Sequence, residues 1–269
     1  MSENRGEATG YLVPQFSIHR GKLHDLLLRA VKERLGENCV STDHAFVSFE
    51  RDEGSVTARF TRRSNPDLAA KVPSLTTDVL VGADGINSTA RSLLYPNEGP
   101  PNFSGRLLWR GVSRRDPFLT GRSMVWAGHA DQKFIAYPVG RQAELEGKSL
   151  VNWIAVLRVR ANDDPDLTPP TVDWGKVVSK DRFASHVQTW TFGFLSIPDL
   201  IAEAEEESGF PMCDRTPVDR WSFGRLTLLG DAAHPLYPST SSSSTQVKYV
   251  KVQRLITYSW IERSASSHS

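Results

Sequence analysis

The chain has 269 residues, with 32 basic and 31 acidic side chains and a formal net charge of +1. Its hydrophobic fraction of 39% and its seven tryptophans can fill a sizeable core, which excludes a chain that is disordered throughout. Balanced charge argues against a general nucleic-acid binder, and no apolar run approaches the roughly 18 residues that a membrane span needs.

The two cysteines, Cys39 and Cys213, lie far apart in the sequence and cannot form a disulfide framework or a zinc knuckle. The N-terminal residues are polar and lack the apolar centre of a signal peptide. We therefore expect a mixed α/β protein of the cytoplasm, without a metal site and without a membrane or nucleic-acid partner.

The first elements follow from simple periodicity. Residues 16–18 form a short extended run, and apolar residues at helical spacing from Leu23 onward predict a helix that Gly36 ends. Two alternating runs, 46–49 and 56–60, flank the turn residues 52–54 and predict a β-hairpin.

The pattern then becomes richer in strands. We expect a strand at 77–81, a short helix at 88–94, and strands at 107–111, 123–128, 134–138 and 151–158. Helices are predicted at 174–187 and 197–207, and a last apolar strand at 226–229. The clustered strands indicate a sheet separate from the first layer.

The first candidate motif is Ile18-His19-Arg20-Gly21, between an extended run and a helix. The planar guanidinium of Arg20 suits phosphate or ribose oxygens. A solvated arginine at the start of a helix is the simpler alternative.

The second motif runs from Asp78 to Arg91, where an apolar strand leads into Gly82-Ala83-Asp84-Gly85. A ligand can approach the backbone closely at such a glycine-flanked turn. An ordinary turn, followed by a helix that Ser88 caps, explains the same residues.

The third motif is Leu228-Leu229-Gly230-Asp231-Ala232-Ala233-His234-Pro235. An acid at the carboxyl end of a strand can accept hydrogen bonds from sugar or polyol hydroxyls, and a following helix would point its positive end at the same ligand. We expect His234 to pack or hydrogen-bond rather than to act as a catalytic base.

In this order and spacing, the three motifs resemble those of the group A flavoprotein monooxygenases of the p-hydroxybenzoate hydroxylase and salicylate hydroxylase type, over about residues 16–238. Residues 108–112, 136–139 and 147–153 look like substrate-domain strands of the branch that includes phenazine-modifying enzymes.

The resemblance implies an α/β fold in which an incomplete FAD-binding domain of the glutathione-reductase-like type is joined to a mostly β substrate domain. The partial FAD-binding domain would span 1–98, the substrate sheet 99–210, and a return segment of the FAD domain 211–238. A divergent serine-rich tail would occupy 239–269.

The resemblance also implies FAD as cofactor and NAD(P)H as co-substrate. Arg20 would contact the phosphate–ribose region, Asp84 the pyrophosphate side and NAD(P)H, Asp231 the ribityl chain, and Pro235 the region of the isoalloxazine ring. The candidate cofactor-binding residues are Arg20, Asp84, Gly85, Asp231, Ala232 and Pro235.

The resemblance implies hydroxylation of a small aromatic substrate through a flavin C4a-hydroperoxide. We assign no catalytic side chain. Trp109, Tyr137 and Trp153 lie in the substrate-domain segments, so one of them could face the aromatic ring. Filling the core between sheet and helices is at least as good an explanation for each.

The sequence departs from the family at both ends, and we interpret it as truncated. No two of its 19 glycines are separated by a single residue, so the Gly-x-Gly-x-x-Gly turn that seats a pyrophosphate is absent. Two alternatives stay open: a non-catalytic fragment that binds small aromatics or a partner chain, and another flavoenzyme such as a halogenase or epoxidase. The halogenase signature Trp-x-Trp-x-Ile-Pro is missing.

Overall fold

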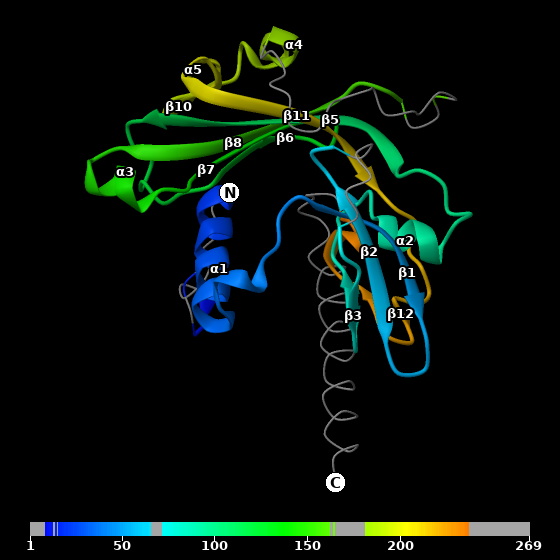
Figure 1. The fold of residues 1–269 in the computed structure, drawn as a ribbon. Helices are drawn as coiled ribbons and strands as arrows, with labels where there is room; N and C mark the ends of the chain where they lie inside the picture. Colours follow the sequence, from blue (N-terminus) through cyan, green and yellow to red (C-terminus); the bar gives the residue numbers. More distant parts are fainter. Residues whose placement is uncertain are drawn as a thin grey trace. The chain divides into compact units, whose positions relative to one another are not determined.

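The computed structural model describes residues 9–12, 14, 16–65, 72–161, 164 and 181–236 (Figure 1). It is a mixed α/β structure, as expected, and consists mostly of strands. Its contacts define two compact units: Met1–Thr42 with Phe103–Met212, and Asp43–Asn102 with Cys213–Ser269. The predicted tail at 239–269 and the first half of the predicted helix at 174–187 lie outside the described residues, whereas residues 181–187 are helical.

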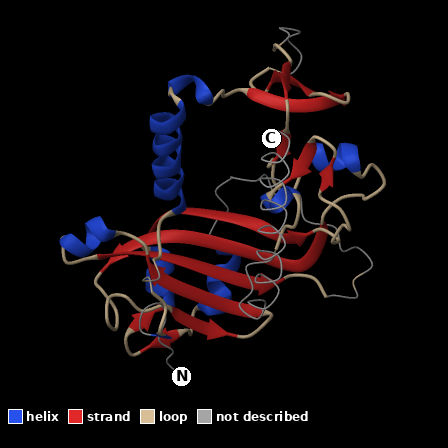
Figure 2. Cartoon of the chain, turned by 90° about the horizontal axis from the view of Figure 1, so that it is seen from below, coloured by secondary structure: helices blue, strands red, loops and turns tan. Residues whose placement is uncertain are grey.

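The first unit is built on a five-stranded sheet in the order β11-β5-β8-β7-β6 (Figure 2). Its strands are β5 (Asn102–Arg115), β6 (Val125–Gly128), β7 (Gln132–Pro138), β8 (Ser149–Arg158) and β11 (Ala204–Asp214). The pairs β5–β8, β7–β8 and β6–β7 are antiparallel. The four strands predicted between 107 and 158 are therefore confirmed.

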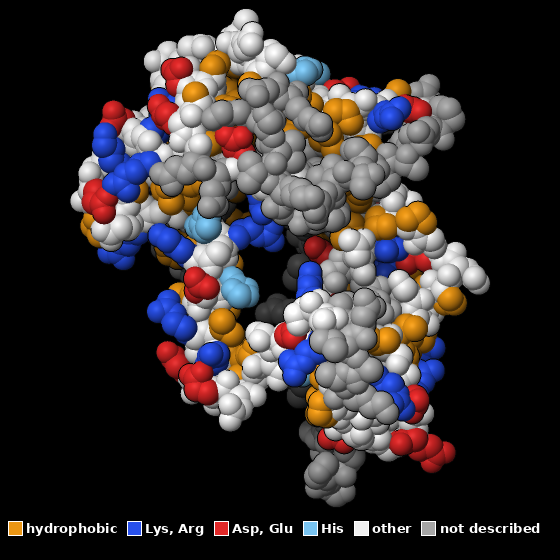
Figure 3. Space-filling model, turned by 45° about the horizontal axis from the view of Figure 1, so that its top comes forward, with side chains coloured by type: hydrophobic (Ala, Val, Ile, Leu, Met, Phe, Trp, Pro, Cys, Tyr) orange, Lys and Arg blue, Asp and Glu red, His pale blue; other side chains and the backbone are white. Residues whose placement is uncertain are grey.

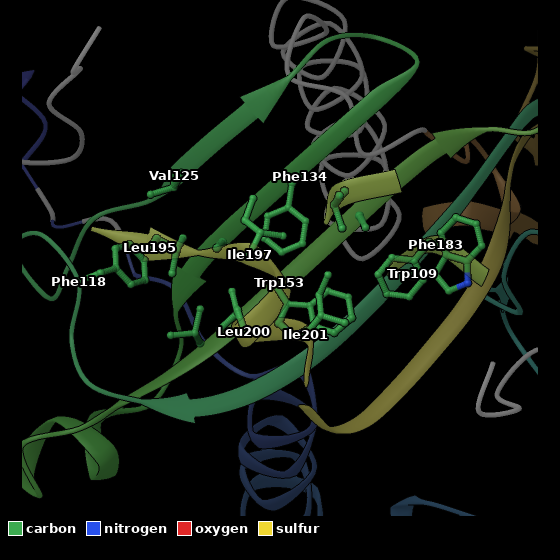
Figure 4. Close-up of a cluster of buried hydrophobic side chains, with 14 of the residues drawn as sticks. Trp109, Phe118, Val125, Phe134, Trp153, Phe183, Leu195, Ile197, Leu200 and Ile201 are labelled. Atoms are coloured by element: carbon green, nitrogen blue, oxygen red, sulfur yellow. The ribbon is translucent and has the colours of Figure 1, made fainter. Parts of the chain in front are cut away.

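One face of this sheet packs against short helices and forms the larger core (Figure 4). The helices are α4 (Asp181–Ala184), η3 (Ser185–Val187) and α5 (Ile197–Ala202); a two-stranded ladder, β9 (Thr191–Phe192) and β10 (Leu195–Ser196), precedes α5. The Trp109 ring stacks on Phe183 at a centroid distance of 5.1 Å. The buried Trp153 donates its Nε1–H to Ser113 Oγ at 3.0 Å.

The prediction of one helix over 197–207 is wrong in its second half. Helix α5 ends at Ala202, and the acidic residues from Ala204 onward enter β11 beside β5. Glutamate is a good helix former, but intrinsic helix propensity is a small free energy that pairing with a sheet overrides.

Three further helical segments belong to the first unit. Helix α1 (Arg20–Leu35) ends at Gly36, whose φ of 93° suits glycine, as predicted, and the single turn η2 (Glu37–Cys39) follows. Helix α3 (Arg141–Leu145) lies between β7 and β8. The extended run predicted at 16–18 is not a strand: it has no ladder partner among the described residues.

The second unit contains two three-stranded sheets. The first has the order β1-β2-β3, with β1 (His44–Arg51), β2 (Val56–Arg62) and β3 (Leu75–Thr77) all antiparallel, so the predicted hairpin is confirmed. The second has the order β12-β13-β4, with β12 (Ser222–Phe223), β13 (Leu226–Leu228) and β4 (Leu80–Gly82).

The prediction of a single strand over 77–81 is wrong, because the chain changes sheets within it. Residues 75–77 pair with β2, whereas 80–82 pair with β13. Both segments are extended, so the local pattern does not reveal the change of partner.

Helix α2 (Thr89–Leu94) packs on the second sheet through a close contact at Gly82. A Cβ atom at Gly82 would lie 2.7 Å from the Ala90 Cβ and 3.2 Å from the Leu228 Cδ2. Glycine at this position therefore allows α2 to approach both strands closely. The short helix predicted at 88–94 is confirmed, and Ser88 is its N-cap.

The surface is mixed in character. On the face shown in Figure 3, blue and red side chains lie interspersed with orange ones, in keeping with a net charge of +1. In the part of the chain that the structure covers, no helix combines the length and apolar character needed to cross a bilayer.

Candidate functional site

Two turns of the second unit meet at one edge of a sheet. Strands β4 and β13 run parallel, with Gly82 opposite Leu228, and the Leu229 N–H donates to the Gly82 carbonyl at 2.9 Å. Asp84 follows the end of β4 and Asp231 follows the end of β13. The carboxyl ends of adjacent parallel strands are a common place for ligands in α/β folds.

The Asp231 turn offers a free carboxylate beside an open backbone. Asp231 is exposed in the single turn η4 (Gly230–Ala232), and none of the described residues hydrogen-bonds to its carboxylate. Gly230 adopts a φ of 61°, with open space where a Cβ would be. Ala232 and Pro235 are buried beneath the turn. A ligand hydroxyl could therefore reach the Asp231 carboxylate without displacing another group.

The Asp84 carboxylate, in contrast, is used within its own turn. Its Oδ1 accepts from the Ser88 hydroxyl at 2.5 Å and its Oδ2 from the Ala90 N–H at 3.1 Å. Gly85 has a φ of 83° and open space at its Cβ position. Asp84 thus holds the start of α2, while a ligand can approach the backbone at Gly85.

A buried ionic cluster lies beneath these turns, and sequence reasoning missed it. Arg91 is 1% exposed and pairs with Glu98, which Arg215 also contacts. Hydrogen bonding from Arg91, and then the charges of Arg91 and Arg215, hold the pKa of Glu98 below its usual value despite partial burial. Arg91 ends the second motif, but Glu98 and Arg215 belong to no recognisable pattern.

Arg20 belongs to the first of the two units. It is the exposed first residue of α1, whereas Asp84 and Asp231 belong to the second unit. Within the first unit its charge acts on Arg110: burial, and then repulsion from Arg20, lowers the pKa of Arg110. Within the second unit, two of the three charged residues singled out in the sequence, Asp84 and Asp231, therefore follow adjacent strands of one sheet.

The three aromatic candidates divide between the two faces of the large sheet. Trp109 and Trp153 are 2% and 0% exposed in the core against α4 and α5, so they fill the core, as the alternative explanation holds. Tyr137 is half-buried and alternates with the core residues Phe134 and Ala136 along β7, which places it on the opposite face.

His234 lies shortly after the Asp231 turn. The His234 ring packs against Trp221 at 5.2 Å between ring centroids, as expected. Among the described residues, no group of three or more His, Cys, Asp or Glu side chains could hold a metal ion.

Comparison with known proteins shows the family to which the chain belongs. The family described as "FAD binding domain" matches residues 22–242. The chain belongs to this FAD-binding family. The match spans both motif turns and begins two residues after Arg20.

Individual relatives agree with this assignment. The chain is 36% identical over 246 residues to the phenazine 1,6-dicarboxylic acid hydroxylase PhzS of Lysobacter antibioticus, covering 91% of this chain and 59% of the relative. It is 29% identical over 227 residues to 3-hydroxybenzoate 6-hydroxylase 1 of Aquipseudomonas alcaligenes, covering 83% and 50%. The resemblance to group A aromatic monooxygenases is thereby confirmed.

A solved structure shares the fold. HpxO of Klebsiella pneumoniae, complexed with FAD and uric acid, superposes with a TM-score of 0.58 at 20% identity, over 80% of this chain and 49% of that one. The chain thus spans about half to three-fifths of the length of the proteins it matches.

FAD is the cofactor that the family implies, and residues of the second unit are suited to bind part of the FAD molecule. The exposed carboxylate of Asp231, which no described residue hydrogen-bonds, suits hydroxyl groups, and the open backbone positions at Gly85 and Gly230 allow close approach. The glycine-rich pyrophosphate turn is not among the residues of this sequence.

Proposed function

We propose that this chain binds FAD and carries part of an NAD(P)H-using aromatic monooxygenase. The observation that carries the proposal is the pairing of β4 with β13, which puts the Asp84 and Asp231 turns at one sheet edge in a member of the FAD-binding family. The relatives are longer than this chain, so the activity of the whole enzyme is part of the proposal.

Five of the six predicted cofactor contacts have a distinct proposed task. Asp231 would accept hydrogen bonds from the ribityl hydroxyls, with Ala232 forming the turn beneath them. Gly85 would let the pyrophosphate side approach, and Arg20 would bind phosphate oxygens. Pro235 would border the ring system. Bound FAD would supply the electron transfer from NAD(P)H and the activation of oxygen.

The sheet face opposite the core is the proposed place for a small aromatic substrate. Arg110 and Tyr137 interact electrostatically there; Arg110 stacks 5.2 Å from the Phe210 ring centroid, and its Nε donates to Ser208 Oγ at 3.2 Å. Two relatives are named for carboxylated aromatics, a phenazine dicarboxylic acid and a hydroxybenzoate. The other N–H groups of Arg110 could bind such a carboxylate.

A visible absorption spectrum tests the proposed cofactor. The purified chain is incubated with FAD and desalted, and we expect the two visible bands of oxidised flavin to remain with the protein. Retained flavin would justify measuring NAD(P)H oxidation with aromatic acids. A colourless chain that is folded by circular dichroism would contradict FAD binding by this sequence.

A further inference from the structure

The partly buried carboxylate of Glu98 joins two arginines beneath the sheet edge formed by β4 and β13. Arg91 donates from Nε to Glu98 Oε2 at 2.8 Å and also bonds Oε1 through Nη2, while Arg215 Nη1 donates to Oε2 at 3.3 Å. The three side chains are 1%, 13% and 7% exposed for Arg91, Glu98 and Arg215. The cluster therefore lies almost wholly out of water.

The two arginines reach opposite turns of the site. Arg91 Nη1 donates to the carbonyls of Ala232 and Ala233, at 3.0 and 2.8 Å, directly after Asp231. Arg215 Nε donates to the carbonyl of Ile86 at 2.6 Å, in the turn that contains Asp84 and Gly85. A path of charge-assisted bonds thus runs from one turn through Glu98 to the other.

From this path we infer that Glu98 is a positioning residue, which locks the Asp84 turn and the Asp231 turn together so that the Asp231 carboxylate is held toward its ligand. The identity of that ligand as FAD rests on the proposed function, whereas the locking of the turns does not.

The chemistry explains why all three members are needed. Each arginine also bonds backbone carbonyls, Thr216 for Arg91 and Gly99 for Arg215, and these neutral acceptors cannot balance two buried positive charges. Glu98 supplies the balancing charge and fixes the plane of both guanidinium groups, which are rigid forks. Without Glu98, the Arg91 guanidinium that donates to the carbonyls of Ala232 and Ala233 is no longer held in one orientation.

Hydrogen exchange of the wild-type chain and two matched variants tests the locking directly. Glu98→Gln keeps the shape and removes the charge; Glu146→Gln does the same to an exposed pair with Arg114 in the other unit. The amides of Ala233 and His234, both bonded to the Gly230 carbonyl, report on the Asp231 turn. We expect their exchange to accelerate about tenfold or more in Glu98→Gln alone, since a hydrogen bond to a charged group is lost.

A second variant guards against general unfolding. Arg215→Lys keeps the positive charge but cannot hold Glu98 and the Ile86 carbonyl with one planar fork. We expect faster exchange at both turns, with the β1–β2 amides of the same unit unchanged, and weaker FAD binding than in Glu146→Gln. Unchanged turn exchange in both variants, or equal acceleration throughout the unit, would overturn the inference. If the wild-type chain binds no FAD while both variants show the local acceleration, only the proposed function is refuted.

Discussion

Asp84 and Asp231 stand at matching places after two adjacent strands, yet the molecule uses them differently. The Asp84 carboxylate caps α2, while the Asp231 carboxylate has no hydrogen-bond partner among the described residues. The strand-and-glycine pattern indicated that a ligand could approach both turns, and the family resemblance implied that both acids contact the cofactor. The sequence could not show that Ser88 and Ala90 would take up the first carboxylate, since that depends on the local turn geometry.

Substitution of Ser88 should therefore affect stability. Ser88→Ala removes the hydroxyl that donates to Asp84 and accepts from the Arg91 N–H at 2.8 Å. We expect a loss of about 1–2 kcal/mol in the free energy of unfolding, the usual cost of deleting a helix N-cap. Urea denaturation measures it, with Ser92→Ala on the same helix as the comparison; equal losses in the two variants would argue against the cap.

The two cysteines should differ in reactivity. Burial, and then the charge of Asp214, raises the pKa of Cys213 to about 11, while Cys39 is exposed. Because the thiolate is the reactive form, Cys213 should react roughly 100-fold more slowly than an ordinary thiol near pH 8. A thiol-reactive chromophore should then show one fast and one slow phase, and Cys39→Ser should remove the fast phase; two equally fast cysteines would be the contrary result.

At the scale of elements, local patterns predicted most helices and strands. Apart from the hairpin, they did not predict which strands pair with each other. The hairpin, α1, α2 and the strands β5 to β8 follow from periodicity and turn residues. The sheet change between β3 and β4, and the conversion of the acidic run after α5 into β11, depend on contacts far along the chain. The edge formed by β4 and β13 joins residues about 146 positions apart, so only the family resemblance could suggest it.

Helix α1 leads to a prediction about its apolar side chains. None of its residues is buried, and Leu26 and Leu27 are 51% and 54% exposed. Leu26→Glu should change the free energy of unfolding by less than about 0.5 kcal/mol and improve solubility, as expected of a surface substitution. Leu200→Ala, in the core, should cost about 2–5 kcal/mol in the same denaturation assay. A comparable loss in both variants would mean that α1 is covered in solution.

At the scale of the molecule, the residues predicted to contact the cofactor belong to two compact units. The family resemblance implies that Arg20, Asp84 and Asp231 all contact the cofactor. In the structure, Arg20 belongs to the unit of the large sheet, and Asp84 and Asp231 belong to the other unit. Family membership is confirmed for most of the chain. The roles of single residues stay predictions, because they depend on the bound ligand.

The ionic cluster predicts an acid dependence of stability. The pKa of Glu98 is lowered below its ordinary value of 4.5 in the folded state, so its ionised form stabilises the fold above that pH. This contribution is lost as pH falls through the folded pKa. Urea denaturation at pH 7 and pH 4 should show a smaller drop for Glu98→Gln than for the wild-type chain. The same drop in both proteins would contradict this assignment.

The most direct test of the flavin site compares two exposed acids of the second unit. Asp231→Ala removes the free carboxylate at the ligand edge, and Asp219→Ala removes one that lies before β12. Titration of each protein with FAD, followed by flavin fluorescence, gives the Kd. We predict that Asp231→Ala raises Kd by about 10- to 100-fold, the value of charge-assisted hydrogen bonds, and that Asp219→Ala leaves it unchanged. Equal Kd values for both variants and the wild-type chain would contradict a flavin site at this edge.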